Sequence, residues 1–214
     1  THCTSSAASD VYKRQESLWD QIRLNSKLQY DSDRSEIANA SEKYIGNQYL
    51  INRLSKNGQR YLYYTVKEGL RKNLPVELSL IPFVESQFDP YARSATGASG
   101  IWQFIPSTAK ENGLKKNWWY DGRRDIVAST EAAYGFLSKL YERYGDWLIA
   151  IAAYNAGPSR IRKEIEKNKK KGLPTDFWSL NLPRETKSYV PKILAIVELI
   201  RNPDRFDIQL PFLP

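Results

Sequence analysis

Apolar residues recur three and four positions apart along most of the chain, and this spacing constrains the fold more than any other feature. The period is that of an amphipathic helix that turns one face to a core. No segment alternates apolar and polar residues as a half-buried strand does, and no repeat of fixed period is present. The sequence therefore predicts an all-α fold.

The helical pattern is interrupted by glycines, prolines and two polar loops. Asn57 and Gly58 end the first long segment, and Pro75 opens a segment that is almost entirely apolar and should be central. Residues 89–100 (DPYARSATGASG) have turn chemistry throughout, and residues 173–183 form a second loop. We expect helices over residues 36–54, 61–72, 76–86, 100–112, 125–143, 147–154, 158–171 and 185–201.

Composition and charge limit the class of protein and of partner. The chain has 214 residues, of which 41% are hydrophobic and 13% aromatic, so it can bury a core and is not intrinsically disordered. A net charge of +8 favours an anionic partner without choosing among nucleic acid, acidic lipid and acidic polymer. The lysine run at residues 169–171 fits a solvated helix face, and no recognition helix accompanies it. We therefore expect no nucleic-acid partner.

The single histidine, His2, and the single cysteine, Cys3, both lie at the extreme N-terminus. Their positions exclude Ser-His-Asp and Cys-His catalysis, a histidine-bearing zinc site and an intrachain disulfide from the domain. We expect neither a metal nor a cofactor. If the protein is an enzyme, carboxylates, hydroxyls, amides or lysines carry the chemistry.

The first fifteen residues, THCTSSAASDVYKRQ, show neither the apolar run of a signal peptide nor a helical period. Residues 10–15 (DVYKRQ) resemble the translation of a transposase adaptor used to make sequencing libraries. We therefore expect residues 1–15 to be a non-native leader that replaces the true N-terminus and any export signal or anchor. The alternative is a native polar tail.

Glu85 is the acid with the most unusual sequence context. It closes the apolar segment LSLIPFVES beside a glycine-rich loop, where desolvation would raise the pKa of its carboxyl and keep a useful fraction protonated as a general acid. The alternative is a surface glutamate at a helix end. Asp89 opens an Asp-Pro turn and is expected to be structural, and Asp121 and Asp125 are candidates only if the fold returns them to a cleft.

Three separated motifs resemble, in order, those of the family-1 lytic transglycosylases, the SLT domain family. They are residues 85–109 (ESQFDPYARSATGASGIWQFIPSTA), residues 153–157 (AYNAG) and residues 185–190 (ETKSYV). An ordered set of this kind is far more specific than a single pair of residues. Residues 101–103 are Ile-Trp-Gln where the broad family pattern has Leu-Met-Gln or similar, which fits one subgroup of the family.

The resemblance implies a lysozyme-like helical fold that acts on peptidoglycan glycan strands. In this family the β-1,4 bond between N-acetylmuramic acid and N-acetylglucosamine is cleaved without water, because the C6 hydroxyl of the muramic acid attacks its own C1 and forms a 1,6-anhydro ring. Glu85 would first protonate the leaving oxygen and then accept the proton of that hydroxyl. No second carboxylate is needed, unlike in ordinary glycosidases.

The resemblance also assigns roles in the site to three polar side chains. Ser94 matches the position whose hydroxyl bonds the catalytic carboxyl, and Gln103 and Asn155 match amides that hydrogen-bond sugar substituents. The alternatives are an ordinary loop serine for Ser94 and a helix C-cap for Asn155.

Two tyrosines and two glycines complete the expected binding site. Tyr154 and Tyr189 match cleft tyrosines that hold the catalytic acid or the N-acetyl group, although a tyrosine on an apolar helix is more often part of the core. Gly97 and Gly100 would let the backbone approach the sugar or adopt positive φ.

Several large aromatic residues could belong either to a sugar-binding site or to the core. Trp102 could form the floor of a sugar subsite or belong to the core. The cluster of Trp118, Trp119 and Tyr120 has the same ambiguity.

We expect four segments: the leader at residues 1–15, an N-terminal helical extension at 16–58, the lysozyme-like domain at 59–201 and a C-terminal tail at 202–214. The protein is expected to be a monomer in the periplasm. Association with the outer membrane would require an N-terminal anchor that this sequence has lost.

Two other functions remain open. A goose-type lysozyme would use the same fold and acid to hydrolyse the same bond with water. A catalytically silent protein would keep the groove and use its positive charge to hold anionic peptidoglycan.

Overall fold

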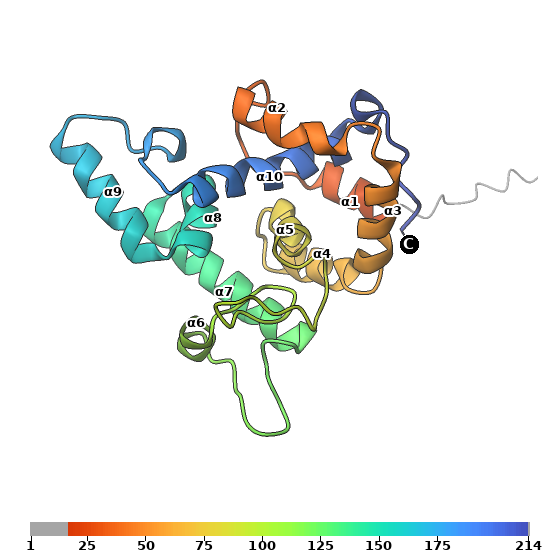
Figure 1. The fold of residues 1–214 in the computed structure, drawn as a ribbon, viewed down its shortest axis with the longest axis horizontal. Coiled ribbons are helices and arrows are strands. Elements are labelled where there is room, and N and C mark those ends of the chain that lie inside the picture. The colour runs from red at the N-terminus through yellow and green to blue at the C-terminus, as the bar shows by residue number, and fades with distance from the viewer. Residues whose placement is uncertain (1–16, 214) are drawn as a thin grey trace, which may run out of the picture.

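A computed structural model describes residues 17–213, and this part of the chain is helical, with three isolated β-bridges and no strand. The predicted all-α class is confirmed. The α-helices of the described residues (Figure 1) are α1 (Leu18–Leu24), α2 (Ser35–Ser41), α3 (Gln48–Gly58), α4 (Leu62–Arg71), α5 (Ile81–Glu85), α6 (Pro106–Glu111), α7 (Ile126–Tyr144), α8 (Trp147–Ala156), α9 (Pro158–Lys170) and α10 (Arg184–Arg201). The 3-10 helices are η1 (Glu42–Tyr44), η2 (Val76–Leu80), η3 (Phe177–Ser179) and η4 (Pro203–Phe206).

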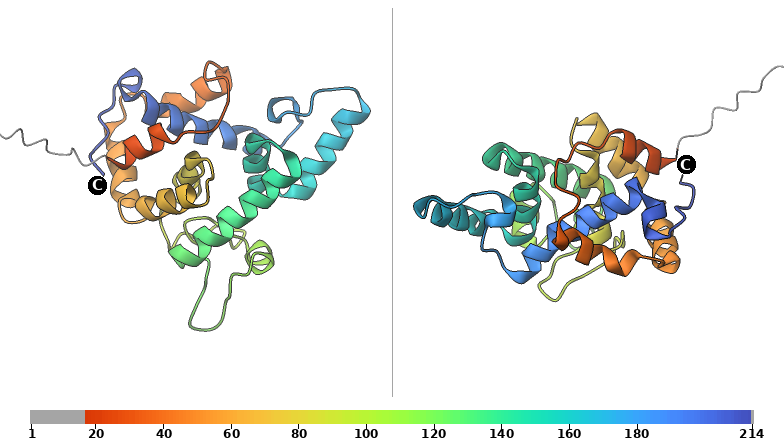
Figure 2. Two further views of the ribbon diagram at one scale, coloured as in Figure 1. Left: turned by 180° about the vertical axis from the view of Figure 1, so that it is seen from behind. Right: turned by 90° about the horizontal axis from the view of Figure 1, so that it is seen from above.

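Helix α10 runs through the body of the molecule and joins its parts. It packs against α1, α2, α5 and α8, and Figures 1 and 2 show it extending from the end of α8 along the length of α2. Every residue of 189–200 except Lys192 is buried. A helix buried over so much of its surface is part of the core rather than a covering layer.

The apolar segment predicted as one helix over 76–86 is central, but it is built from two helices. Residues 76–80 form η2 and residues 81–85 form α5, and η2 packs on α4 while α5 packs on α10. Pro82 accounts for the change because it has no N–H to continue a helical ladder and is tolerated only in the first turn of a new helix. The end of α5 is Glu85.

The single helix predicted over residues 36–54 is wrong, because the chain breaks between η1 and α3. Gly46 adopts a φ of +63°, and its N–H bonds to the carbonyl oxygen of Phe206 at 2.8 Å instead of to a preceding turn. Asn47 then caps α3, accepting a bond from the Leu50 N–H at 3.1 Å. A contact with residues far along the chain therefore overrides the local period.

The helix predicted over residues 100–112 is correct only from Pro106 onward. Residues 100–102 are irregular because side chains occupy their carbonyl oxygens. Those side chains are Gln103 for Gly100, Ser86 for Ile101 and Tyr154 for Trp102, at 2.7, 3.0 and 2.7 Å. Carbonyls bonded in this way are not available to a helical ladder.

The remaining predicted helices are confirmed to within about two residues, as expected for assignments of helix ends. They correspond to α4, α7, α8, α9 and α10. The loop predicted at residues 89–100 is present, as is the loop at 173–183, which contains η3.

The two ends of the described chain lie against each other. The Leu18 N–H bonds to the Leu213 carbonyl oxygen at 2.8 Å, and the Trp19 indole bonds to that of Pro211 at 2.8 Å. The described part of the expected extension packs on α4 and α10 through α1 and α2. The division at residue 58 stays a prediction, and the expected leader, residues 1–15, lies outside the described residues.

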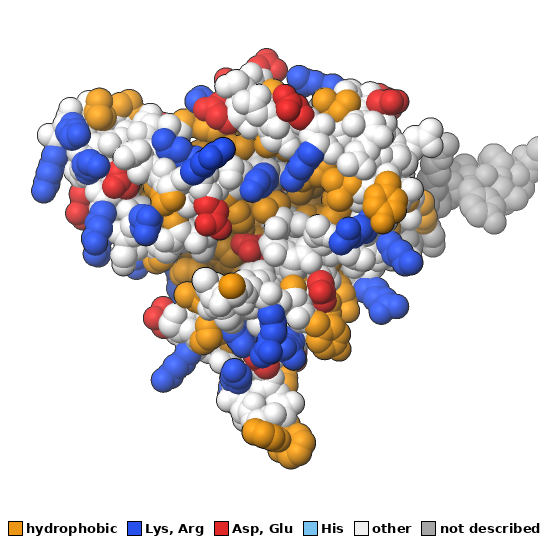
Figure 3. Space-filling view, viewed as in Figure 1, with side chains coloured by type: hydrophobic (Ala, Val, Ile, Leu, Met, Phe, Trp, Pro, Cys, Tyr) orange, Lys and Arg blue, Asp and Glu red, His pale blue; other side chains and the backbone are white. Residues whose placement is uncertain are grey.

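One segment projects from this body. Residues 113–125, between α6 and α7, form a hairpin-like arm that extends away from the helices (Figures 1 and 3). Within residues 17–213 no helix is both long and apolar enough to span a bilayer.

The loop before α6 depends on a glycine that contacts the chain itself. Gly97 and Gly100 share a φ of +82°, but only the Cβ of a residue at 100 would lie 1.8 Å from the Arg123 carbonyl oxygen. We expect Gly100→Ala to lower the free energy of unfolding by about 3 kcal/mol, and Gly97→Ala, which meets no atom within 4 Å, by about 1 kcal/mol. Urea denaturation of the two variants measures both, and equal losses would contradict this account.

Candidate active site

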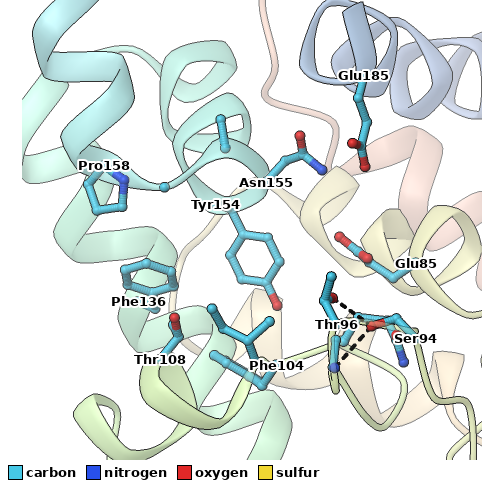
Figure 4. Close-up of a pocket in the computed structure, with 15 residues that line it drawn as sticks. Glu85, Ser94, Thr96, Phe104, Thr108, Phe136, Tyr154, Asn155, Pro158 and Glu185 are labelled. Atoms are coloured by element: carbon cyan, nitrogen blue, oxygen red, sulfur yellow. Dashed lines mark hydrogen bonds between the residues drawn. The ribbon is translucent and has the colours of Figure 1, made fainter. Parts of the chain in front are cut away.

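A pocket of about 320 Å³ opens where α5, the loop before α6, the end of α8 and the start of α10 meet (Figure 4). These segments are distant in sequence, and the packing of α10 on α5 and α8 brings them together. Of the predicted site residues, the pocket wall contains Glu85, Ser94, Gln103, Tyr154 and Asn155. Tyr189 lies behind the wall, in contact with Glu85.

Glu85 is held at the wall because the helix that carries it ends there. Ile81, Pro82 and Phe83 are buried, so the first turn of α5 is fixed in the core. Gln87 and Phe88 then adopt φ values of +53° and +59°, which turn the chain away immediately after the acid. The carboxyl of Glu85 therefore projects from a rigid apolar base into the pocket.

The surroundings of Glu85 favour its protonated form near neutral pH. Desolvation by burial is the largest influence, and it raises the pKa of the carboxyl to about 7, with a smaller rise from the negative charge of Glu185. The hydroxyl of Tyr189 donates a hydrogen bond to Oε1 of Glu85, which lowers the pKa and opposes both effects. The expected buried acid is thus present, with the opposing influences identified.

The two tyrosines predicted to lie in the cleft have different partners. Tyr189 is buried and bonds to Glu85, whereas the Tyr154 hydroxyl donates to the carbonyl oxygen of Trp102 at 2.7 Å. Tyr154 also packs edge-on to Phe104, with ring centroids 6.0 Å apart. Tyr189 therefore positions the acid, and Tyr154 fixes the loop that forms the opposite side of the pocket.

Ser94 lies on the pocket wall with its hydroxyl engaged inside the loop. Its Oγ accepts a bond from the Ala98 N–H at 3.0 Å and lies 2.9 Å from the hydroxyl oxygen of Thr96 (Figure 4). Thr96, which the sequence analysis did not single out, lines the same pocket. The pair presents two hydroxyl groups below Glu85, and the Ser94 hydroxyl bonds within its own loop instead of to the Glu85 carboxyl, as the resemblance had implied it would.

The two predicted amides each have one end fixed by the protein. Gln103 donates through Nε2 to the carbonyl oxygen of Gly100 at 2.7 Å and more weakly to that of Ala92 at 3.3 Å. The Oδ1 of Asn155 accepts a bond from the Thr186 hydroxyl at 3.0 Å. The remaining polar atoms, Oε1 of Gln103 and Nδ2 of Asn155, give the pocket one acceptor and one donor.

The predicted glycines shape the loop and are not brought to the pocket wall. Gly100 is buried against the backbone of Arg123, and Gly97 accepts a bond from the Arg123 guanidinium at 2.8 Å. Both adopt the positive φ that the sequence analysis allowed for. Their effect on the pocket is through the placement of Ser94 and Gln103.

The structure shows which of the large aromatic residues belong to the core and which are exposed. Trp102 is fully buried, donates to Thr130 Oγ1 at 3.0 Å and packs edge-on to Tyr134, so it belongs to the core. Trp118 and Trp119 are exposed on the projecting arm, away from the pocket wall.

The three aspartates considered in the sequence analysis stay out of the pocket and have structural partners. Asp89 accepts a bond from the Tyr91 N–H at 2.8 Å, Asp121 pairs with Arg123 at 2.7 Å, and Asp125 caps α7. Asp89 is therefore the turn residue that we expected. No group of three or more potential metal ligands occurs among residues 17–213.

Glu185 is the charged pocket residue to which the sequence analysis assigned no role. It lies in the first turn of α10, exposed at the rim of the pocket, and its charge reaches Glu85. Its spacing could have indicated a place near the acid, because Glu185 and Tyr189 are four residues apart and so share a helix face. Phe104, Thr108 and Phe136 also line the pocket, and no local pattern indicated them.

The fold and the site define a helical protein with a buried acid on the wall of a polar pocket, and comparison with known proteins identifies the class. Residues 63–176 match the family model described as "Transglycosylase SLT domain". The chain therefore belongs to the transglycosylase SLT domain family, as its motifs indicated.

Individual relatives agree with this membership. The membrane-bound lytic murein transglycosylase D of Escherichia coli (strain K12) is 44% identical over 180 residues, which are 84% of this chain and 40% of that protein. A protein of Alteromonas sp. (strain M-1) named for tributyltin chloride resistance is 40% identical over 150 residues, 70% of this chain and 72% of its own length. This chain thus spans less than half of the Escherichia coli relative.

A solved structure supports the fold. The 70 kDa soluble lytic transglycosylase of Escherichia coli matches with a TM-score of 0.52 and 21% identity, over 81% of this chain and 31% of that one. The likeness confirms the expected lysozyme-like helical architecture.

Removing either neighbour of Glu85 should shift its pKa in a known direction. Tyr189→Phe deletes the hydrogen bond that stabilises the carboxylate, so the pKa should rise above 7 by about one unit. Glu185→Gln deletes a negative charge, so the pKa should fall by about half a unit. Carbon NMR titration of the Glu85 carboxyl measures both shifts, and shifts of the same sign would contradict the assignment.

Glu85 should also destabilise the protein at high pH. Its carboxyl has a pKa of about 7 in the folded state against 4.5 for an unperturbed glutamate, so the folded state binds more protons between these values and stability falls as the pH rises through them. Glu85→Gln cannot ionise and should be more stable than the parent at pH 8 by on the order of 2–3 kcal/mol. At pH 4 the two should differ little. Urea denaturation at both pH values tests this, and a pH-independent difference would refute it.

Proposed function

We propose that this chain is a lytic transglycosylase that cleaves the β-1,4 bond between N-acetylmuramic acid and N-acetylglucosamine in peptidoglycan and leaves a 1,6-anhydro end. The observation that carries the proposal is the carboxyl of Glu85, with a pKa raised to about 7 by burial at the wall of a polar pocket. An acid with that pKa can both give and take a proton at neutral pH.

The proposed reaction uses Glu85 twice. In the first half, the bond from C1 of the muramic acid to O4 of the N-acetylglucosamine breaks, and the Glu85 proton moves to O4. In the second half, O6 of the same muramic acid bonds to C1, and its proton returns to the Glu85 carboxylate. The acid ends in its starting state, and no water is consumed.

The neighbours of Glu85 suit both halves of this cycle. The Tyr189 hydroxyl stabilises the carboxylate that exists between the two proton transfers, while desolvation restores its basicity for the second. Oε1 of Gln103 and Nδ2 of Asn155 would meet sugar substituents, with Ser94 and Thr96 offering hydroxyls beside the acid. The two amides are already fixed at their other ends and the two hydroxyls lie within hydrogen-bond distance of each other, so little ordering is needed on binding.

The hydrolytic alternative has one observation in its favour. Glu185 is a second carboxylate at the pocket, and an inverting glycosidase uses a second carboxylate to activate water. We favour the transglycosylase because the relatives with matching motifs carry that name. The silent wall-binding alternative leaves the raised pKa of Glu85 without a purpose.

We infer that the protein works in the cell envelope on peptidoglycan, since the relative of Escherichia coli is named as membrane-bound and as acting on murein. The finer proposals are a periplasmic monomer that needs no cofactor and an outer-membrane association through an N-terminal anchor. They rest on the family resemblance alone.

Mass spectrometry of the products from purified peptidoglycan tests the proposal. The parent protein should release fragments ending in 1,6-anhydro-muramic acid, and Glu85→Gln should lower turnover by about a thousandfold while still binding glycan. Asp89→Asn, which alters a nearby acid that does not line the pocket, is the matched control and should retain turnover.

The product decides between the alternatives. Reducing ends together with loss of turnover in Glu185→Gln would establish the hydrolase instead. Binding without any turnover by the parent protein would establish the silent wall-binding protein.

A further inference from the structure

The projecting arm carries two tryptophans that nothing in the described chain covers. Trp118 is 88% exposed and Trp119 is 90% exposed, and both lie at the apex of the arm, where Figure 3 shows apolar side chains at the extremity of the molecule. A folded protein gains by covering such large apolar side chains, so a pair left at an apex indicates an interaction surface.

The apex is a built turn and not a loose loop. Oδ1 of Asn117 accepts bonds from the N–H groups of Trp119 and Tyr120 at 2.8 and 2.7 Å, and the Asn117 N–H bonds to the Tyr120 carbonyl oxygen at 2.8 Å. Lys116 and Asp121 form a β-bridge just below. The backbone that carries the two indoles is therefore held in one conformation, which lowers the entropic cost of binding.

A cationic collar, Lys115 and Lys116, lies one step behind the apex, and both lysines are exposed. Asp121 lies close enough to Lys116 to interact with its charge, but its closest ion-pair partner is the guanidinium of Arg123, at 2.7 Å. Asp125 accepts bonds from the Tyr120 hydroxyl and the Ala128 N–H. From the tip inward, the arm thus presents indole rings and then positive charge.

We propose that this arm is a peripheral membrane anchor, whose tip inserts Trp118 and Trp119 into the headgroup region of an anionic lipid bilayer. Indoles favour the interface between headgroups and acyl chains because they are apolar rings with one polar N–H. Lysines just above that depth meet the phosphates of anionic lipids. The order of groups along the arm matches the order of layers in the bilayer.

Two features argue against other occupants. The indole rings meet edge-to-face, with an interplanar angle of 83° and centroids 6.4 Å apart, so they do not form one flat platform for consecutive sugar rings. The apex is convex and fringed by lysines, and lysine is depleted in protein–protein interfaces. The arm also points away from the α5, α8 and α10 elements of the pocket, so a membrane at its tip leaves the pocket open (Figure 1).

Flotation with lipid vesicles tests the proposal on the full chain. Vesicles of equal parts phosphatidylglycerol and phosphatidylethanolamine should bind the protein more tightly than vesicles of phosphatidylcholine, and added salt should weaken the binding. The double variant Trp118→Ala/Trp119→Ala should bind at least about tenfold more weakly. Tyr49→Ala, which removes an aromatic that is 77% exposed on α3, is the matched control and should bind as the parent does.

Two further measurements localise the contact. Lys115→Gln/Lys116→Gln should lose the preference for phosphatidylglycerol while keeping residual binding through the indoles. Tryptophan fluorescence of the parent should shift to the blue on adding vesicles, and the double tryptophan variant should show no such shift, since its other tryptophans are not at the apex.

Several outcomes would overturn the proposal. These are equal vesicle binding by the parent and the double tryptophan variant, no vesicle binding by the parent, or a variant that loses binding to insoluble peptidoglycan but not to vesicles, which would make the tip a glycan contact. Turnover of soluble glycan strands by the double variant should match the parent. Failure of the proposed reaction would appear in that turnover and not in the vesicle data, so the two proposals can fail separately.

Discussion

The site depends on the burial of the short apolar segment that runs through η2 into α5. Val76, Leu78, Leu80 and Ile81 are fully buried, and each side chain of this size contributes about 1.5–3 kcal/mol when it leaves water. That gain holds the end of α5 against α10 and leaves the Glu85 carboxyl where water cannot fully solvate it. The raised pKa of the acid is a consequence of core packing, and the burial of apolar side chains offsets the free-energy cost of burying the carboxyl.

Helix α10 carries one residue that lowers the pKa of Glu85 and one that raises it. Tyr189 stabilises the carboxylate and Glu185, one turn earlier on the same face, disfavours it. A pKa of about 7 is a balance among desolvation, one hydrogen bond and one like charge, and α10 contributes both the hydrogen bond and the like charge. Small movements of α10 along its axis would change all three together, so the rigidity of this buried helix matters for the chemistry.

Much of this arrangement could be predicted from the sequence, and the failures share one physical cause. The apolar run predicted a buried Glu85, and helical periods located most helices, because both depend on neighbours along the chain. The break at Gly46 depends on a carbonyl at Phe206, and the irregular backbone at Gly100 depends on Arg123 and its own loop. The sequence likewise left open which tyrosine holds the acid, since Tyr189 and Glu85 meet only after the chain has folded.

The hydrogen bonds of Arg123 connect the projecting arm to the loop that forms one side of the pocket. Nη2 of its buried guanidinium binds Asp121 at the base of the arm. Nη1 donates to the carbonyl oxygens of Gly97 and Phe104, in the loop that carries Ser94 and Gln103. One buried side chain therefore fixes both the base of the arm and the loop that forms one side of the pocket. A change in the length of the apex between Asn117 and Tyr120 would leave these contacts in place.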